Sequence, residues 1–333
     1  MTRLLYVRTD RLGETLLNLP VVAALRAALP QSHLSWLINV ELEPLLRGAC
    51  CDAILAYDRS SPRLWWARAW QLARRLRAGH FEVAVISNPM KELHMAVWLA
   101  GIPRRIGYDR KWAWCLTDRL PDRKWLGDRH EVEYNFDLVR TLILTSVPPL
   151  GAQSTLPPYE PEQHEIDHLL EQQGIKPHES FIAIHPWTSN PLKQWPSLKF
   201  RELAGAVAQH IPVVFIGGAE VRERVSEVRP PHGAVIDLVG RLTLRQLAAL
   251  LRRARLLVSN DSGPVHLAAA VGTPTAVLFG TADPATGPRR WGPWGNGHVV
   301  ICKPSMEAIS VAEVLKALEP TLKRDDRTHE DTT

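Results

Sequence analysis

Short apolar segments rich in β-forming residues alternate along this chain with longer segments whose apolar residues recur at helical spacing. The alternation predicts an α/β fold in which parallel strands are flanked by helices. In the first half, strands are expected at 4–8, 34–38 and 83–87, and helices at 14–29, 65–76 and 93–100. In the second half, strands are expected at 181–185, 213–217, 256–259 and 275–279, and helices at 164–173, 198–210, 244–253, 265–271 and 310–322.

The segment 147–161 carries five prolines and little periodicity, which is typical of a linker between domains. We therefore expect one doubly wound domain over 1–155, a second over 162–322, and a disordered polar tail at 323–333. Ligands bind such folds at the carboxyl ends of the strands, so the binding site is expected in a cleft between the two domains.

The 40 basic and 35 acidic residues give a formal charge of +5. This charge fits solvated helix faces, a phosphate-rich substrate or an anionic membrane surface. We expect no nucleic-acid partner, because the chain has no zinc-finger, RNP or basic-zipper signature. The arginine clusters are at 74–77, 104–105 and 252–255.

The four cysteines form no CxxC pair, which predicts free thiols in a reducing cytosol rather than a zinc site or disulfides. Charges at Arg3, Arg8 and Asp10 interrupt any signal-peptide core. The uncharged run 262–282 contains glycines and prolines that make it a poor membrane helix. We expect a cytoplasmic protein whose contact with the cytoplasmic face of the inner membrane, if it has one, is peripheral.

The first candidate site is the segment 9–15 (TDRLGET), which joins the first strand to the first helix. Gly13 permits a tight turn, and Glu14 follows it near the helix N-terminus. Glu14 has two interpretations: it complements the helix dipole, or it is a general base at the ligand-binding edge of the sheet.

Two further segments follow strands in the second half. In 185–196 (HPWTSNPLKQWP), hydroxyls and Lys193 could bind phosphate, although an ordinary surface loop is the alternative. In 259–272 (SNDSGPVHLAAAVG), Asp261 and Ser262 are expected to cap a helix that begins near Gly263, which makes an anion site at its N-terminus. A purely structural helix, with His266 as a core histidine, is the alternative.

A fourth segment, 215–220 (FIGGAE), runs from a strand through two glycines to an acid. Glu220 could hydrogen-bond a ribose diol, or it could be a solvent-facing residue at a helix start. The chain contains no GxGxxG, GxxxxGK[ST], HExxH or GxSxG sequence, which disfavours dehydrogenases, P-loop kinases, zinc proteases and α/β-hydrolases.

Together these segments resemble glycosyltransferase family 9, the bacterial heptosyltransferases. The resemblance rests on four blocks and spans about residues 3 to 320: RLGETLL at 11–17, AGIPRRIGY at 100–108, HP through KQWP at 185–196, and NDSGPVH at 260–266 with DLVG at 237–240. It implies a GT-B architecture, with two facing Rossmann-like domains, an acceptor-binding N-terminal domain and a nucleotide-sugar-binding C-terminal domain.

The resemblance further implies an inverting transferase that moves heptose from an ADP-heptose donor to a glycolipid or glycan acceptor such as the lipopolysaccharide inner core. It makes Glu14 the catalytic base. The implied donor contacts are Thr188, Lys193, Glu220, Leu242, Asp261, Ser262, Gly263 and His266, and the implied acceptor contacts are Arg59, Arg63 and Arg105.

Two positions depart from the family pattern: Glu14 stands where Asp is usual, and Ser262 where Thr is common. The chain also has no Asp-x-Asp pair, the metal clamp of the other common glycosyltransferase architecture, so neither metal nor cofactor is expected. Three alternatives stay open: a GT-B transferase with a different nucleotide sugar, a sugar-nucleotide epimerase, and a non-catalytic glycan-binding protein.

Overall fold

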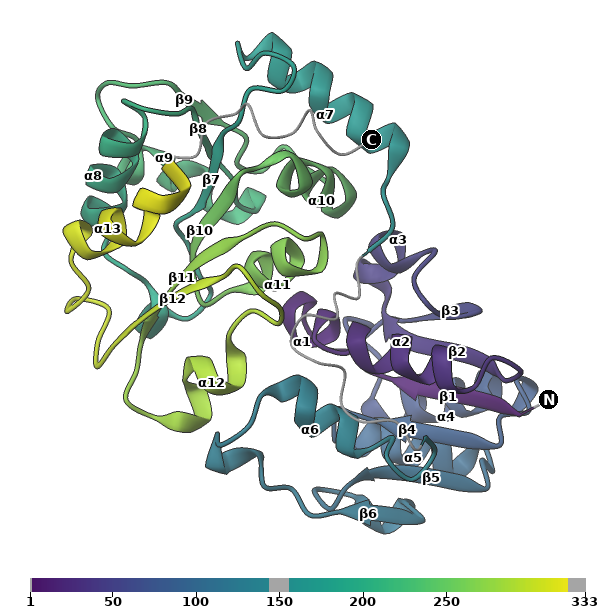
Figure 1. The fold of residues 1–333 in the computed structure, drawn as a ribbon. Helices are drawn as coiled ribbons and strands as arrows, with labels where there is room; N and C mark the ends of the chain where they lie inside the picture. Colours follow the sequence, from purple (N-terminus) through teal and green to yellow (C-terminus); the bar gives the residue numbers. More distant parts are fainter. Residues whose placement is uncertain (1, 144–155, 323–333) are drawn as a thin grey trace. The chain divides into compact units, whose positions relative to one another are not determined.

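The computed structural model describes residues 2–143 and 156–322. The chain divides into two compact units, Met1–Leu156 (unit 1) and Pro157–Thr333 (unit 2). Each unit contains a six-stranded parallel sheet with helices on both sides (Figure 1). The predicted tail and the part of the predicted linker at 147–155 lie outside the described residues. The predicted α/β fold class with two Rossmann-like halves is confirmed.

The sheet of unit 1 has the strand order β3-β2-β1-β4-β5-β6. Its strands are β1 (Arg3–Val7), β2 (His33–Asn39), β3 (Ala53–Tyr57), β4 (Val83–Ile86), β5 (Arg104–Tyr108) and β6 (Asp118–Leu120). Its helices are α1 (Leu12–Leu16), α2 (Leu19–Ala28), α3 (Glu43–Leu46), α4 (Trp65–Ala78), α5 (Lys91–Leu99) and α6 (Glu131–Asp137), with 3₁₀ turns η1 (Val40–Leu42), η2 (Ala113–Cys115) and η3 (Lys124–Leu126).

The sheet of unit 2 has the order β12-β11-β10-β7-β8-β9. Its strands are β7 (Ile182–His185), β8 (Val213–Phe215), β9 (Val235–Asp237), β10 (Leu256–Asn260), β11 (Thr275–Gly280) and β12 (Val299–Lys303). Its helices are α7 (Glu160–Gln172), α8 (Ser197–Val207), α9 (Val225–Val228), α10 (Leu244–Arg253), α11 (Gly263–Ala270), α12 (Pro288–Trp291) and α13 (Val311–Leu322), with 3₁₀ turns η4 (Pro191–Lys193), η5 (Ala219–Arg224) and η6 (Pro284–Thr286).

The strand order places the candidate segments at the middle of each sheet. In unit 1, Val7 at the end of β1 pairs with Leu37 of β2 on one side and Ile86 of β4 on the other. In unit 2, β7 and β10 are neighbours, and Ser259 pairs with His185. In unit 1 the strand order runs from β1 out to β3 and then resumes at β4 on the other side of β1. In unit 2 it runs from β7 out to β9 and resumes at β10 on the other side of β7. Doubly wound sheets bind ligands at such switch points.

The helix expected at 14–29 is two helices, α1 and α2. The break falls at Leu17 and Asn18, because Pro20 has no N–H to donate to the carbonyl of Leu16 and so cannot continue the ladder. Asn18 bridges the break, since its side chain donates to the carbonyl of Glu14 at 2.7 Å.

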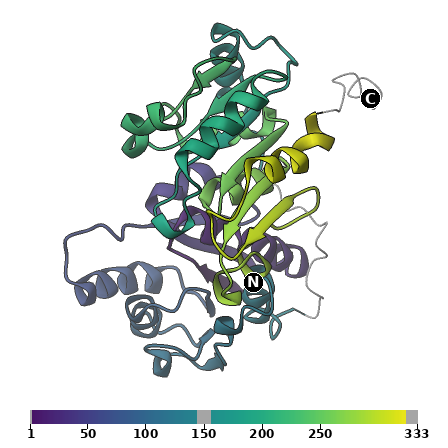
Figure 2. The same ribbon diagram turned by 90° about the vertical axis from the view of Figure 1, so that its left-hand side faces the viewer.

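Apolar side chains of alternate strand residues form a core on each face of the sheets. In unit 1, Leu5 and Val7 pack with α4 and α5 in one buried cluster. In unit 2, α8 and α13 lie side by side over one face (Figure 1, Figure 2), where Phe200 and Leu318 are fully buried. Within residues 2–143 and 156–322, no helix is both long and apolar enough to cross a membrane.

Candidate functional site

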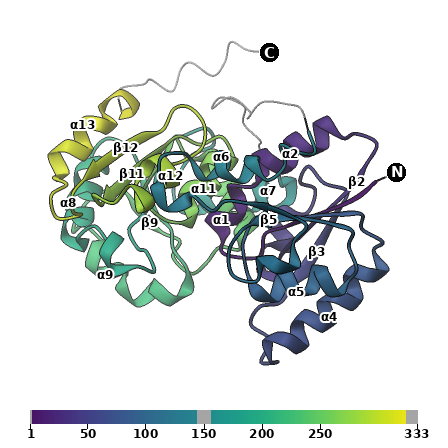
Figure 3. The same ribbon diagram turned by 90° about the horizontal axis from the view of Figure 1, so that it is seen from below.

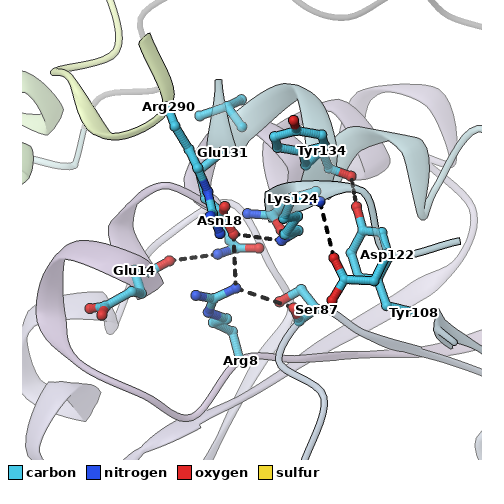
Figure 4. A network of polar contacts seen from close by, with 12 residues as sticks. Arg8, Glu14, Asn18, Ser87, Tyr108, Asp122, Lys124, Glu131, Tyr134 and Arg290 are labelled. Atoms are coloured by element: carbon cyan, nitrogen blue, oxygen red, sulfur yellow. Dashed lines mark hydrogen bonds and ion pairs between the residues drawn. The ribbon is translucent and has the colours of Figure 1, made fainter. Parts of the chain in front are cut away.

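Glu14 lies in the first turn of α1, just beyond the carboxyl end of β1, and is half-buried. Its backbone is fixed through Asn18, whose Oδ1 accepts a hydrogen bond from the Tyr6 hydroxyl at 2.6 Å. The Glu14 carboxylate points away from these contacts (Figure 4), and no described residue hydrogen-bonds to it. A carboxylate held in this way can accept a proton from a bound hydroxyl.

A buried arginine lies beside this segment. Nε of Arg8 is 2.8 Å from Oδ1 of Asp10. Nη1 of Arg8 is 3.6 Å from Oε1 of Glu131 and donates to the carbonyl of Ser87 at 3.2 Å (Figure 4). Burial by itself would lower the pKa of Arg8, but the carboxylates of Asp10, Glu131 and Glu14 together raise it above its ordinary value. Arg8 therefore stays charged and balances the carboxylates of Asp10 and Glu131.

The same network continues to a buried lysine. Nζ of Lys124 donates to Oε1 of Glu131 at 2.5 Å and to Oδ1 of Asn135 at 2.9 Å, and it lies 4.7 Å from the centre of the Tyr108 ring. No role was predicted for Arg8, Glu131 or Lys124. The available signal was a charge directly after the apolar strand sequence LLYV, but the partners of Arg8 come from distant parts of the chain.

An arginine-rich pocket of about 240 Å³ is bordered by the end of β3, the loop that follows it and helix α4. Its lining residues are Tyr57, Asp58, Ser61, Arg63, Arg68, Gln71, Leu72 and Arg75. Arg68 is locked by two hydrogen bonds to Glu92 of 2.7 and 2.9 Å, whereas the exposed guanidinium of Arg63 donates to Gln71 at 3.2 Å. The pocket can hold an anionic group.

The other two predicted acceptor residues differ in their surroundings. Arg59 is exposed and donates to the carbonyl of Thr9 at 3.4 Å, which brings it beside the Glu14 segment. Arg105 donates to the carbonyls of Cys115, Ile102 and Pro103, so its guanidinium is already used within the fold. An acceptor contact by Arg105 remains a prediction that the structure does not favour.

In unit 2, Asn260 fixes the segment 186–196 against the end of β10. Its Oδ1 accepts from the Trp195 amide at 3.0 Å, and its Nδ2 donates to the Pro186 carbonyl at 2.7 Å. Trp195 is fully buried and donates through its indole nitrogen to the carbonyl of Ile309 at 3.1 Å. Gln194 closes the loop by accepting from the Thr188 amide at 3.2 Å.

This clamp brings Lys193 to Asp261. The two side chains form an ion pair between Nζ and Oδ2, with the carboxylate largely buried and the lysine about one-third exposed. Burial raises the pKa of Asp261, and the ammonium of Lys193 partly offsets this rise. Asp261 thus orients Lys193, and the donor contact predicted for Asp261 stays a prediction.

The start of α11 differs from the expected capping. Ser262 is the N-cap residue, but neither it nor Asp261 forms a side-chain cap. Ser262 Oγ instead lies 2.9 Å from Ser259 Oγ and 3.2 Å from Nδ1 of His185, while Asp261 holds Lys193. The predicted side-chain caps are therefore wrong: both side chains are engaged elsewhere, and the amide of Gly263 is left without one.

Two histidines stand near this helix start. His266 lies within the first turn of α11 and is buried, at 6% exposure. Burial lowers the pKa of His185 to about 4, so it is neutral at pH 7 and hydrogen-bonds the two serines as an uncharged ring. The positive side of the site therefore comes from Lys193 and the helix N-terminus.

Glu220 follows β8 and Leu242 follows its neighbour β9, the outermost strand on that side of the sheet. Glu220 is exposed and folds over Gly218, where an added Cβ would come within 2.1 Å of its carboxylate. Gly240 has φ +68° and packs on Ala219, which explains why this turn requires glycine. Leu242 follows it and is half-buried.

The predicted donor residues therefore fall into two groups. Thr188 and Lys193 follow β7, and Asp261, Ser262, Gly263 and His266 follow the neighbouring strand β10, whereas Glu220 follows β8 and Leu242 follows β9. Among the described residues, no three His, Cys, Asp or Glu side chains gather in a way that could hold a metal ion.

These features define a class: a chain of two doubly wound α/β units in which the second carries a lysine and a helix N-terminus at its switch point. Residues 69–319 match the family model described as glycosyltransferase family 9 (heptosyltransferase). The chain belongs to glycosyltransferase family 9.

Similarity to individual proteins extends over most of the chain. Lipopolysaccharide heptosyltransferase 3 of Escherichia coli is 26% identical over 309 residues, covering 86% of this chain and 85% of that protein. The crystal structure of a family 9 glycosyl transferase from Veillonella parvula superposes with a TM-score of 0.86 at 22% identity, covering 96% and 97% of the two chains. E. coli heptosyltransferase WaaC with ADP-2-deoxy-2-fluoro heptose gives 0.74 at 20% identity, covering 96% and 99%. These likenesses confirm the GT-B fold.

Proposed function

We propose that this glycosyltransferase transfers a heptose from an ADP-sugar to an acceptor of the lipopolysaccharide inner core or a related surface glycan. The observation that carries the proposal is the Lys193–Asp261 pair at the start of α11, beside the Gly263 amide. A fixed ammonium and a helix N-terminus suit the diphosphate of a nucleotide sugar. The choice of ADP-heptose is supported by E. coli relatives named heptosyltransferases and by the WaaC structure with an ADP-heptose analogue.

On the donor side, Lys193 and the Gly263 amide take the negative charge that grows on the leaving diphosphate. Preorganised groups of this kind often contribute more to catalysis than any other effect, because they need no rearrangement during the reaction. Thr188 contributes a hydroxyl from the same loop, while Glu220 and Leu242 bind the ribose and the base. Protein groups stabilise the negative charge on the leaving diphosphate, so we expect transfer without a divalent metal.

On the acceptor side, Glu14 removes the proton from the attacking hydroxyl. The oxygen then bonds to the anomeric carbon of the donor as the bond from that carbon to the diphosphate breaks, which inverts the configuration. Arg59 and Arg63 bind acidic groups of the acceptor, and the pocket that Arg63 shares with Arg68 and Arg75 supports this assignment.

The test is a transfer assay with ADP-heptose, UDP-hexoses and GDP-hexoses, each with and without an inner-core acceptor and in the presence of EDTA. We expect product only with ADP-heptose and acceptor, with the anomeric configuration inverted by NMR. Transfer from a uridine or guanosine donor alone would overturn the donor assignment and favour a different surface-glycan transferase. Conversion of a nucleotide sugar without acceptor would indicate an epimerase, and donor binding without turnover a non-catalytic protein.

A further inference from the structure

Unit 1 carries an exposed cluster of indole rings that the transfer reaction does not use. We name it the tryptophan face and define it by Trp65, Trp66 and Trp70 of α4, Trp98 of α5, and Trp112 and Trp114 at η2. The helices α4 and α5 lie side by side (Figure 3). The face thus belongs to one rigid pair of helices and the turn packed on them.

Four of the six rings form a continuous series, and Trp66 and Trp70 lie on the neighbouring side of α4. Trp65 contacts Trp112 with ring centres 5.2 Å apart, Trp112 contacts Trp114 at 5.6 Å, and Trp114 contacts Trp98 at 5.5 Å. Four indoles of the face are largely open to solvent: Trp66 (55%), Trp70 (55%), Trp98 (44%) and Trp114 (53%). Grouped exposed apolar surface of this kind marks an interaction site rather than ordinary surface.

Basic groups are interleaved with the rings. Arg74 lies over the Trp70 ring at 5.0 Å from its centre, and Lys91 over the Trp65 ring at 4.3 Å. Trp66, Trp70 and Arg74 are spaced by four residues, so they share one side of α4. Helix α4 contains four arginines and no acidic residue. The face is therefore both aromatic and positively charged.

Among possible occupants, this combination fits a lipid surface. Tryptophan is enriched at the boundary between lipid headgroups and acyl chains, because its ring is apolar and its N–H is polar. Arginines on an amphipathic helix add attraction to anionic headgroups. Tryptophan and arginine are also common at protein interfaces, but an apolar protein partner would leave Arg74 and Lys91 without anionic groups to pair with.

We propose that the tryptophan face docks unit 1 on an anionic phospholipid surface. Helix α4 lies at the interface, with Trp66 and Trp70 entering among the headgroups and Arg74 pairing with lipid phosphates. The proposal does not depend on the identity of the donor sugar. It also gives a physical reason for the arginine pocket along α4, since an acceptor with a lipid anchor would arrive at the same helix.

The experiment is co-sedimentation of the full chain with vesicles of phosphatidylcholine, or of phosphatidylcholine with 30% phosphatidylglycerol, free of any glycolipid. We expect binding to the anionic vesicles, weaker binding to the neutral ones, and loss of binding as salt rises. The double variant W66S/W70S should bind about tenfold more weakly or worse, because membrane binding scales with the apolar area buried. Arg74→Gln should weaken binding about fivefold, since a basic residue near such a surface contributes about 1 kcal/mol.

The matched control is Trp125→Ser, which removes an indole that is 72% exposed but lies outside the tryptophan face. It should bind vesicles like the unchanged chain, and all variants should keep the same circular dichroism melting curve. Absence of binding to anionic vesicles, or equal binding by W66S/W70S, would overturn the proposal. So would a dimer in sedimentation velocity that W66S/W70S dissociates, because the face would then bind a second copy of the chain.

Discussion

At the scale of single residues, the most informative contact is that between Lys193 and Asp261. A long lysine side chain loses rotamer entropy when it binds a ligand. The buried carboxylate of Asp261 holds the ammonium before any donor arrives, and Asn260 fixes the loop that carries it. Part of the ordering cost of donor binding is thereby met during folding.

Lys193→Ala is expected to weaken ADP binding about 10- to 150-fold, because a hydrogen bond to a charged group contributes about 1.5–3 kcal/mol. Isothermal calorimetry with ADP measures the change. The matched control is Lys176→Ala, which removes an exposed lysine after α7 and should leave the affinity unchanged.

Lys193→Arg keeps the charge and should retain more affinity than Lys193→Ala. Lys193→Ala leaves Asp261 as a buried carboxylate without its ion-pair partner, which also destabilises the fold. The double variant K193A/D261N removes that charge, so it separates a loss of ADP affinity from a loss of stability. If K193A/D261N bound ADP as tightly as the unchanged chain, Lys193 would not be a donor contact.

Local sequence could place the candidate residues that lie between a strand and a helix. Glu14, Lys193 and Ser262 were placed correctly after the strands β1, β7 and β10, while their roles in binding and catalysis stay predictions. The charge network around Arg8 could not be predicted, because Glu131 comes from a helix more than a hundred residues later. Ser262 holds the predicted N-cap position of α11, but the predicted side-chain caps do not form, because Lys193 and His185 engage Asp261 and Ser262 instead and local sequence does not reveal tertiary partners.

At the scale of elements, α10 shows a boundary that local sequence determines fully. The helix was expected at 244–253 and is observed at Leu244–Arg253. Thr243 and Gln246 form a reciprocal capping box, with hydrogen bonds of 3.3 and 2.9 Å. The amphipathic spacing and the capping residues both place the helix start at Leu244, so tertiary contacts do not shift this boundary.

Other elements could not be predicted for physical reasons. Strands β3, β5, β6, β9 and β12 were not expected from the pattern. Two of them have only three residues, and β5 begins with two arginines. Such strands form because a neighbouring strand offers its edge, as β4 does for β5 and β8 for β9.

Thr243→Ala should lower the free energy of unfolding by about 1 kcal/mol, within a range of about 0.5–2, because the N-cap bond of α10 is lost. Urea denaturation followed by circular dichroism measures this as a lower midpoint. Thr243→Ser keeps the hydroxyl and serves as the control, with a midpoint close to that of the unchanged chain. An equal midpoint for Thr243→Ala would show that the capping box contributes nothing to α10.

At the scale of the whole molecule, the two units have the same strand plan but different chemistry at the equivalent position. The switch point of unit 1 carries an acid, Glu14, beside a buried arginine network. That of unit 2 carries a lysine and a helix N-terminus. We expect this division to show in ligand binding, with nucleotide bound by unit 2.

Hydrogen exchange with and without ADP tests this division. At ADP concentrations about 100 times Kd, amides that exchange only through opening of the ADP-bound structure should be protected by up to about 2.7 kcal/mol, or about 100-fold in rate. The largest protection is expected at 186–196 and 259–267, with little change in unit 1. Protection confined to unit 1 would contradict the assignment of the donor site.

The central claim, that Glu14 of unit 1 is the base of a transferase whose donor is bound by residues of unit 2, is tested most directly by Glu14→Gln. Transfer rate and ADP affinity are measured on the same preparation, with Glu41→Gln, an exposed acid at η1, as the control. We predict a fall in kcat of about 10²–10⁴-fold with ADP affinity nearly unchanged, because general-base catalysis contributes about that factor. Full activity of the Glu14→Gln enzyme would contradict the account.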